Sequence, residues 1–172
     1  IWNIVAKINN DKLLYKDYKV VPWCARCGTT LSSHELAQGY QDVKDLTVTV
    51  KFRLQTEDDE LPTYVLAWTT TPWTLPGNVG LAVGAKLDYV KAKVGNDILI
   101  LAEAKLSLLS EDYEVVEKLK GADLVGLSYE PLYPFLKENL SESEKSKLEN
   151  AFKIYSADFV TTTDGTGVVH IA

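Results

Sequence analysis

Residues 64–74 read YVLAWTTTPWT, and this stretch decides how the surrounding chain can fold. Its first seven residues, 64–70, are mostly aromatic, aliphatic or β-branched, which is the composition of a buried strand. Pro72 has no N–H to donate to a strand ladder, so we expect the strand to end there. The stretch therefore predicts a buried strand that stops abruptly at a polar tip.

The tip carries three consecutive hydroxyls, those of Thr69, Thr70 and Thr71. Because side chains alternate along a strand, Thr69 and Thr71 lie on one face and Thr70 on the other. One interpretation is structural, since threonine favours strands and its hydroxyl pairs with neighbours across a sheet. The other is the wall of a binding pocket, which is favoured by the Pro-, Trp-, Gly- and Asn-containing segment 72–78.

Short strands are predicted on both sides of this stretch. Alternation of apolar and polar residues over 48–54 predicts a half-buried strand, and an acidic turn at 57–60 links it to 64–70. Further strands are expected at 18–21, 80–83, 89–94, 98–102, 115–119, 125–129, 152–155 and 168–171. Many short strands with few helices favour a β-rich α/β fold, built on a small closed or nearly closed barrel with peripheral helices.

Three segments have the pattern of helices. Apolar residues at helical spacing over 1–15 predict a helix that stops near the Asn9–Asp11 cluster. A brief helix is expected at 103–109, and another within 136–150, where Ser141 and Glu144 form a capping-box pattern. We place a connector or stalk at residues 1–42 and the main domain at 43–172.

Composition excludes several classes of protein. With 172 residues, 46% hydrophobic and 24% charged, the chain has the make-up of a soluble globular protein. A net charge of −6 argues against a protein that grips a nucleic-acid backbone by itself. No apolar run approaches the roughly 18 residues of a membrane span. The chain starts at Ile1 and contains no methionine, so we expect a piece of a longer protein.

The two cysteines, Cys24 and Cys27, are spaced to share one tetrahedral metal ion, and Gly28 follows them in a tight turn. Three interpretations remain open: half of a zinc knuckle, a thioredoxin-like redox pair, or unpaired structural cysteines. The redox pair is disfavoured, because a Gly-Thr-Thr sequence follows where that motif needs a helix. Zinc requires four ligands, and only His34 is a plausible third.

The two histidines have different surroundings in the sequence. His34 lies in LSSHEL beside Ser33 and Glu35, but adjacent side chains point in different directions, so we assign it no catalytic role. His170 closes an apolar strand directly after a Gly-Thr-Gly turn. A histidine there either is satisfied within the core or projects into a cleft, and the pattern leaves both alternatives open.

Three segments together resemble the editing insertion of the isoleucyl-tRNA synthetase family. They are KVVPWCARCGTTLSSHELAQGY (19–40), WTTTPWTLPGN (68–78) and ADFVTTTDGTGVVHIA (157–172). The likeness covers nearly the whole chain and is weakest over 136–150. Relatives specific for valine and leucine typically have Thr-Thr-Arg-Pro followed by an acid, whereas Pro72 is preceded by Thr71 and followed by Trp73 here.

The resemblance implies a class I synthetase editing domain that hydrolyses the ester of valyl-tRNA(Ile). It implies catalytic roles for Thr69, Thr70, Thr71 and His170, and substrate binding by Trp73, Asn78 and Gly167. Trp73 and His170 would shape a sieve that admits valyl and refuses isoleucyl. The pocket would use water as nucleophile, no cofactor and no ATP. The implied partners are the 3′ end of tRNA(Ile) carrying valine and the remainder of a cytoplasmic synthetase, with no membrane.

The sequence departs from the family at its end. The family continues after this histidine strand to an aspartate that holds the substrate's ammonium group, whereas the printed residues stop at Ala172. We therefore expect weak or absent deacylation by these residues alone. We also expect zinc only in a full-length parent, because a second Cys pair follows in many relatives. The alternative function is a zinc-ribbon-type structural or RNA-binding module centred on Cys24 and Cys27.

Overall fold

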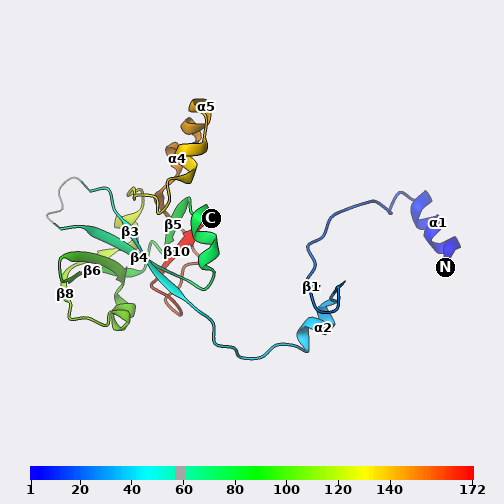
Figure 1. Ribbon diagram of the computed structural model, residues 1–172, viewed down its shortest axis with the longest axis horizontal. Coiled ribbons are helices and arrows are strands. Elements are labelled where there is room, and N and C mark those ends of the chain that lie inside the picture. Colours follow the sequence, from blue (N-terminus) through cyan, green and yellow to red (C-terminus); the bar gives the residue numbers. More distant parts are fainter. Residues whose placement is uncertain (57–60) are drawn as a thin grey trace. The chain divides into compact units, whose positions relative to one another are not determined.

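The computed structural model describes residues 1–56 and 61–172, so the acidic turn expected at 57–60 lies outside the described residues. The chain divides into two compact units, Ile1–Lys44 and Asp45–Ala172 (Figure 1). The second unit contains almost all of the strands and the whole of the hydrophobic core.

The first unit is a string of small elements. Helix α1 (Trp2–Asn10) ends where the Asn-Asn-Asp cluster predicts. Strands β1 (Trp23–Cys24) and β2 (Thr29–Thr30) pair in a hairpin, and α2 (Ser33–Ala37) follows. The strand expected at 18–21 is wrong: these residues have no partner strand, and they are exposed. No side chain is buried within residues 1–44, all of which the structure describes.

The second unit contains a five-stranded sheet with the order β3-β4-β7-β6-β8. Its strands are β3 (Val48–Arg53), β4 (Thr63–Thr69), β6 (Asp88–Val94), β7 (Asp97–Ala102) and β8 (Glu114–Lys120). Neighbouring strands are antiparallel except for β4 and β7, which are parallel. A two-residue turn joins β6 to β7, because Val94 pairs with Asp97 and Gly95 adopts a φ of +58°. This hairpin confirms the turn expected from Gly-Asn-Asp.

A second sheet has three strands with the order β10-β5-β9, namely β10 (Val168–Ile171), β5 (Gly80–Val83) and β9 (Lys153–Ser156). The central strand, β5, is buried at all four positions, pairs antiparallel with β10 and runs parallel to β9. With the hairpin of the first unit there are three separate sheets among the described residues. The closed or nearly closed barrel expected from the sequence is not found: the strands form separate sheets, and between the edge strands β3 and β9 the segment 127–130 makes only isolated bridges.

Short helices connect the strands. They are η1 (Pro72–Gly77), η2 (Glu103–Leu108), α3 (Gly121–Leu124), α4 (Phe135–Asn139), α5 (Glu142–Lys145) and η3 (Ser146–Asn150). The expected capping box is confirmed, since the Ser141 N–H and hydroxyl both donate to the Glu144 carboxylate. The strand expected at 125–129 is reduced to isolated bridges at Ser128 and Tyr129.

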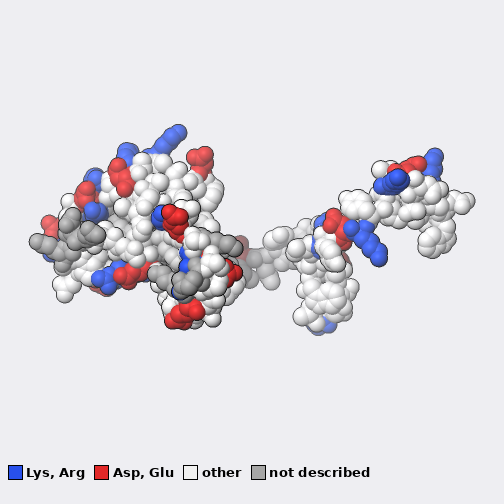
Figure 2. Space-filling model, turned by 90° about the horizontal axis from the view of Figure 1, so that it is seen from above, with Lys and Arg blue, Asp and Glu red and all other residues white. Residues whose placement is uncertain are grey.

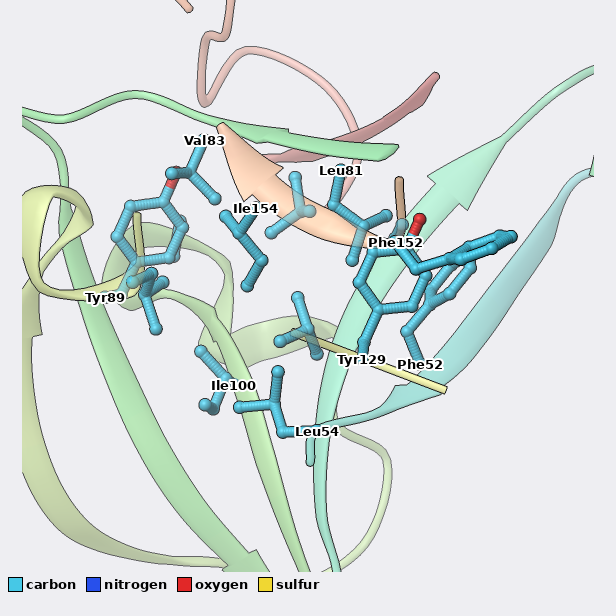
Figure 3. Close-up of a cluster of buried hydrophobic side chains, with 14 of the residues drawn as sticks. Phe52, Leu54, Leu81, Val83, Tyr89, Ile100, Tyr129, Phe152 and Ile154 are labelled. Atoms are coloured by element: carbon cyan, nitrogen blue, oxygen red, sulfur yellow. The ribbon is translucent and has the colours of Figure 1, made fainter. Parts of the chain in front are cut away.

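The main core lies within the second unit and draws on both of its sheets. Figure 3 shows Phe52, Tyr129 and Phe152 gathered at one side of this cluster, with Tyr89 at the other. The rings of Phe52 and Tyr129 meet edge to face with centroids 5.3 Å apart, a favourable geometry for aromatic pairs. Packing of both sheets onto one core fixes the end of β4 relative to the start of β10.

The surface of the second unit carries both signs of charge. On the face shown in Figure 2, lysines and arginines are interspersed with aspartates and glutamates. The ion pair Lys91–Glu117 links the neighbouring strands β6 and β8, and Lys51–Asp97 links β3 to β7 across β4. In the described part of the chain, the structure contains no helix of the length and apolarity that a membrane crossing requires.

Candidate functional site

A cavity of about 340 Å³ opens where β4 ends and β10 begins. Its lining combines three aromatic or imidazole side chains, four threonines and a glycine-containing turn with a single carboxylate. These residues are Trp68, Thr69, Thr70, Thr71, Phe159, Thr161, Asp164, Gly165, Gly167, Val168, Val169 and His170. The cavity therefore brings together the two segments of the chain, 68–71 and 164–170, that the sequence analysis singled out.

The threonine run forms one wall because Pro72 ends β4 and starts η1. Thr69 is buried, and its hydroxyl oxygen accepts a hydrogen bond of 3.0 Å from the backbone N–H of Thr71. The hydroxyls of Thr69 and Thr71 are also 3.2 Å apart, so they lie on one face as alternation predicts. Thr70 and Thr71 are exposed at the mouth, where their hydroxyls can meet a ligand.

His170 stands on β10 at the other wall and meets Thr74 of η1. The Thr74 hydroxyl donates to the carbonyl of Thr71 at 2.8 Å, so its oxygen is free to accept from Nε2 of His170 at 3.0 Å. This places the imidazole proton on Nε2 and leaves Nδ1 as an acceptor. Nδ1 is buried without a hydrogen-bond partner among the described residues.

Burial lowers the pKa of His170 below its ordinary value, because an imidazolium loses hydration there. The ring is therefore neutral at pH 7, with Nε2 bonded to Thr74 and Nδ1 an acceptor without a partner among the described residues. Such a wall accepts an aliphatic group without placing a positive charge next to it.

Two of the predicted substrate-binding residues do not line the cavity. Trp73 is 72% exposed on η1. Asn78 is buried, and its amide donates to the carbonyls of Gly80 and Ile171 while its oxygen accepts from the hydroxyl of Tyr129. Asn78 thus holds the loop and β10 in place, which is one of the roles that its position allows.

Sequence reasoning missed several lining residues. Phe159 is 65% exposed although it is aromatic, and Asp164 supplies the only carboxylate among the lining residues. Gly165 lies against Trp68, since a Cβ at that glycine would be 3.0 Å from the indole ring. The signal was available in the turn-forming residues next to the predicted strand 168–171. What the sequence could not show is that this turn packs against Trp68.

The Cys-x-x-Cys segment of the first unit forms a knuckle between β1 and β2. The N–H of Cys27 donates to Sγ of Cys24 at 3.3 Å, and Gly28 takes a φ of +68° to make the turn. This donor geometry fits half of a thiolate zinc site. His34 does not join it: the described residues contain no group of three or more His, Cys, Asp or Glu that could hold a metal. The amide of Gln38 lies 3.0 Å from His34 Nε2 instead.

The chemistry available in the cavity is that of positioning. Its lining contains hydroxyls, a neutral imidazole and one carboxylate, and it includes neither a cysteine nor a lysine as nucleophile. Hydroxyls and backbone groups at fixed places can orient a water molecule and stabilise charge on an ester oxygen. The arrangement suits hydrolysis by bound water better than covalent catalysis.

Comparison with known sequences gives matches along the entire chain. An isoleucine–tRNA ligase of Clostridium tetani is 47% identical over 173 residues, which cover 100% of this chain and 16% of that protein. One of Clostridium acetobutylicum is 48% identical over 172 residues with the same coverage. One of Bacillus thuringiensis is 47% identical over 173 residues. The chain spans about 16% of the length of these relatives. No family model matches it.

Solved structures share the fold at low sequence identity. A crystal structure of GlLeuRS-CP1 has a TM-score of 0.56 at 16% identity, covering 73% of this chain and 54% of that one. The editing domain of the cytosolic leucyl-tRNA synthetase of P. knowlesi has a TM-score of 0.56 at 17% identity, covering 77% and 60%. At these identities the likeness shows a common fold, which is mixed α/β and rich in strands.

Proposed function

The chain is a homologue of one segment of the isoleucine–tRNA ligase family, and from this premise we propose that its cavity hydrolyses valyl-tRNA(Ile). The reaction is cleavage of the ester between valine and the terminal adenosine, by water and without ATP or a cofactor. The observation that carries the proposal is the threonine run facing His170 across one cavity. The chain spans about 16% of the length of these ligases, so the activity of a whole ligase belongs to the proposal.

The need for such a site is energetic. One methylene in an apolar pocket is worth only about 1–3 kcal/mol, a limit for which isoleucyl-tRNA synthetase is itself the established example. A synthetic site that binds isoleucine therefore cannot exclude valine well enough. A second cavity that is too small for isoleucine corrects this, because it destroys only the smaller product.

The residues of the cavity have distinct parts in this mechanism. The hydroxyls of Thr70 and Thr71 at the mouth hold the ester and the attacking water, and buried Thr69 keeps Thr71 in place through its hydrogen bond. His170 and Thr74 close the side where the amino acid's side chain enters. A neutral imidazole held by Thr74 forms a firm wall there, and rigidity is what a size limit requires.

The partners follow from the same proposal. They are the 3′ end of tRNA(Ile) carrying valine and the remainder of a cytoplasmic synthetase. A net charge of −6 indicates that most phosphate contacts lie on the remainder. Residues 1–42 would serve as the connector to that remainder. Its Cys24–Cys27 knuckle would supply two thiolates to a zinc ion whose other ligands the parent enzyme provides.

The test is single-turnover hydrolysis with the chain in excess over valyl-tRNA(Ile) and isoleucyl-tRNA(Ile). We expect slow release of valine above the uncatalysed background and no enhanced release of isoleucine. Thr71→Val, which removes the hydroxyl, should abolish the enhancement, and Thr71→Ser, which keeps it, should not. Equal release of both amino acids, or no effect of Thr71→Val, would refute the proposal.

A double cysteine variant distinguishes the proposed hydrolytic function from the alternative, a zinc-ribbon-type structural or RNA-binding module. Cys24→Ser combined with Cys27→Ser should leave valine release within about twofold of wild type, because no side chain in that unit is buried. Loss of tRNA binding with intact hydrolysis in this double variant would favour the module instead.

A further inference from the structure

Three neighbouring strands of the five-stranded sheet each contribute one hydrogen bond to the dipeptide Thr166–Gly167. From β4, the carbonyl of Leu66 accepts a bond of 2.5 Å from the Thr166 hydroxyl. From β7, the N–H of Ala102 donates to the Thr166 carbonyl at 2.9 Å. From β6, the hydroxyl of Tyr89 donates to the Gly167 carbonyl at 2.6 Å. We call these three bonds the Thr166–Gly167 anchor.

The Thr166–Gly167 anchor lies directly before β10, the strand that forms one wall of the cavity. Gly167 lines the cavity, and β10 starts at the next residue and carries His170 two positions further on. The place of β10 relative to the threonine run on β4 therefore depends on where Thr166 and Gly167 are held. Gly167 is packed closely against β7, since a Cβ at this position would be 2.5 Å from the Cβ of Ala102.

The hydroxyl of Tyr89 holds two backbone groups of the second sheet's loops. Its ring is fully buried at one side of the core, where a phenylalanine would fill the same space (Figure 3). The hydroxyl accepts a bond of 3.1 Å from the N–H of Gly84, which follows β5, and donates to Gly167. The Tyr89 hydroxyl therefore links β6 of the five-stranded sheet to two loop residues of the three-stranded sheet. These are Gly84, which follows β5, and Gly167, which precedes β10.

Thr166 also has a buried hydroxyl that bonds to a backbone group. Thr166 is 1% exposed, and its hydroxyl donates to the carbonyl of Leu66. A valine would match its shape. Both hydroxyls are buried, so removal of the Tyr89 hydroxyl leaves the Gly167 carbonyl without this donor, removal of the Thr166 hydroxyl does the same to the Leu66 carbonyl, and the anchor loses one of its three bonds.

We propose that the hydroxyls of Tyr89 and Thr166 are positioning groups that set the spacing between the β4 and β10 walls of the cavity, and with it the discrimination between valyl and isoleucyl esters. This rests on the proposed function for its substrates. Neither residue touches the substrate, and both act through the placement of His170.

The experiment uses the 172-residue chain with four variants. Tyr89→Phe and Thr166→Val each remove one hydroxyl and keep the shape. Thr166→Ser keeps the hydroxyl. Ile100→Val removes one methylene from the core, is not among the cavity residues, and serves as the control for lost stability. The ratio of single-turnover rates for valyl-tRNA(Ile) and isoleucyl-tRNA(Ile) is measured for each.

We expect Tyr89→Phe and Thr166→Val to lower this ratio about five- to tenfold, the scale of one buried hydrogen bond. The ratio for Thr166→Ser and Ile100→Val should stay within about twofold of wild type, even where stability falls. An unchanged ratio in both hydroxyl-free variants would overturn the proposal.

A second readout needs no catalysis. The imidazole resonances of His170 are titrated by NMR and assigned by their absence in His170→Gln. When the anchor is loosened, water reaches the ring, so its pKa should rise toward the ordinary value in Tyr89→Phe and Thr166→Val but not in Ile100→Val. If wild type hydrolyses neither ester, the proposed function fails for these 172 residues alone, and this titration still decides whether the hydroxyls position His170. If Tyr89→Phe does not fold, the two Thr166 variants give the answer.

Discussion

At the scale of single residues, the cavity depends on side chains that meet from distant parts of the chain. Thr74 and His170 are 96 residues apart in sequence, and their side chains are 3.0 Å apart in space. Local pattern in the sequence singled out Thr69, Thr70, Thr71 and His170 but left a structural role open for them, and their catalytic roles were implied by the family resemblance. The contact that gives His170 its place is not visible there.

Asn78 shows the limit of such reasoning most clearly. The family resemblance suggested that Asn78 holds either the nucleotide or the loop, and only the fold shows that its amide bonds to Ile171 and Tyr129. The family resemblance also implied substrate binding by Trp73, which lies beside the threonines in the sequence. Its side chain is exposed and does not line the cavity. Burial is decided by partners remote in sequence, and so these two positions could not be resolved from the pattern.

The lowered pKa of His170 predicts a pH dependence of stability. The unfolded chain, with a histidine pKa of about 6.5, binds more protons than the folded chain just below that pH. The free energy of unfolding should therefore decrease as pH falls through this window. His170→Gln, whose amide can still donate to Thr74, should lose less stability than wild type between pH 7.5 and 5.5 in urea titrations. An equal loss in both proteins would contradict this.

Removal of the Asn78 amide should be costly. Asn78→Ala leaves the buried hydroxyl of Tyr129 without its acceptor and two carbonyls without a donor, and we expect a loss of about 2–4 kcal/mol in the free energy of unfolding. Tyr129→Phe alone should cost about 1 kcal/mol. Because the two groups share a hydrogen bond, the double variant should be less destabilised than the sum of the single ones. Strict additivity in chemical denaturation would show that the bond contributes nothing.

At the scale of elements, alternation and turn residues predicted most of the second unit. The strands at 48–54, 64–70, 80–83, 89–94, 98–102 and 168–171 are all present within a residue or two. The errors at 18–21 and 125–129 share a cause, because both segments have strand-forming residues but lack a full partner strand. Propensity describes a residue's preference for a pleated surface, and a ladder also needs a neighbour.

The glycine turn before β10 gives a prediction at this scale. Gly95 and Gly167 both have positive φ, but only Gly167 is crowded, because its Cβ would be 2.5 Å from that of Ala102. Gly95→Ala should cost about 1 kcal/mol for backbone strain alone. Gly167→Ala should cost about 1–3 kcal/mol more through overpacking. Thermal unfolding of both variants measures the difference, and equal costs would show that the crowding is relieved elsewhere.

At the scale of the whole molecule, the fold class could be predicted from the sequence, but whether the strands close into a barrel could not. The sequence indicates a β-rich α/β protein, which the structure confirms, but the expected barrel is replaced by separate sheets. The strand lengths and turn residues read from a sequence do not determine whether the edge strands of two sheets pair with each other. That is decided by the core, where β5 is buried on both faces and the two sheets of the second unit share one cluster of side chains.

The division into two units predicts that residues 45–172 fold alone. Since no side chain of residues 1–44 is buried, their removal should change the thermal midpoint by no more than about 2–4 °C, the shift that 1 kcal/mol produces in a domain of this size. Unfolding should stay cooperative by circular dichroism. A broad transition, or a fall of more than 10 °C, would show that the first unit supports the second.

The hydrogen bond from Thr166 to Leu66 spans 100 residues. During synthesis on the ribosome, β4 leaves the exit tunnel well before the segment that must face it has been translated. Loop closure over such a distance is slow compared with local pairing, so the β6–β7 hairpin can form early and the cavity between β4 and β10 last. A nascent chain would then acquire the cavity between β4 and β10 only in the final step of this domain's maturation, and a chain stalled before Gly167 would have none.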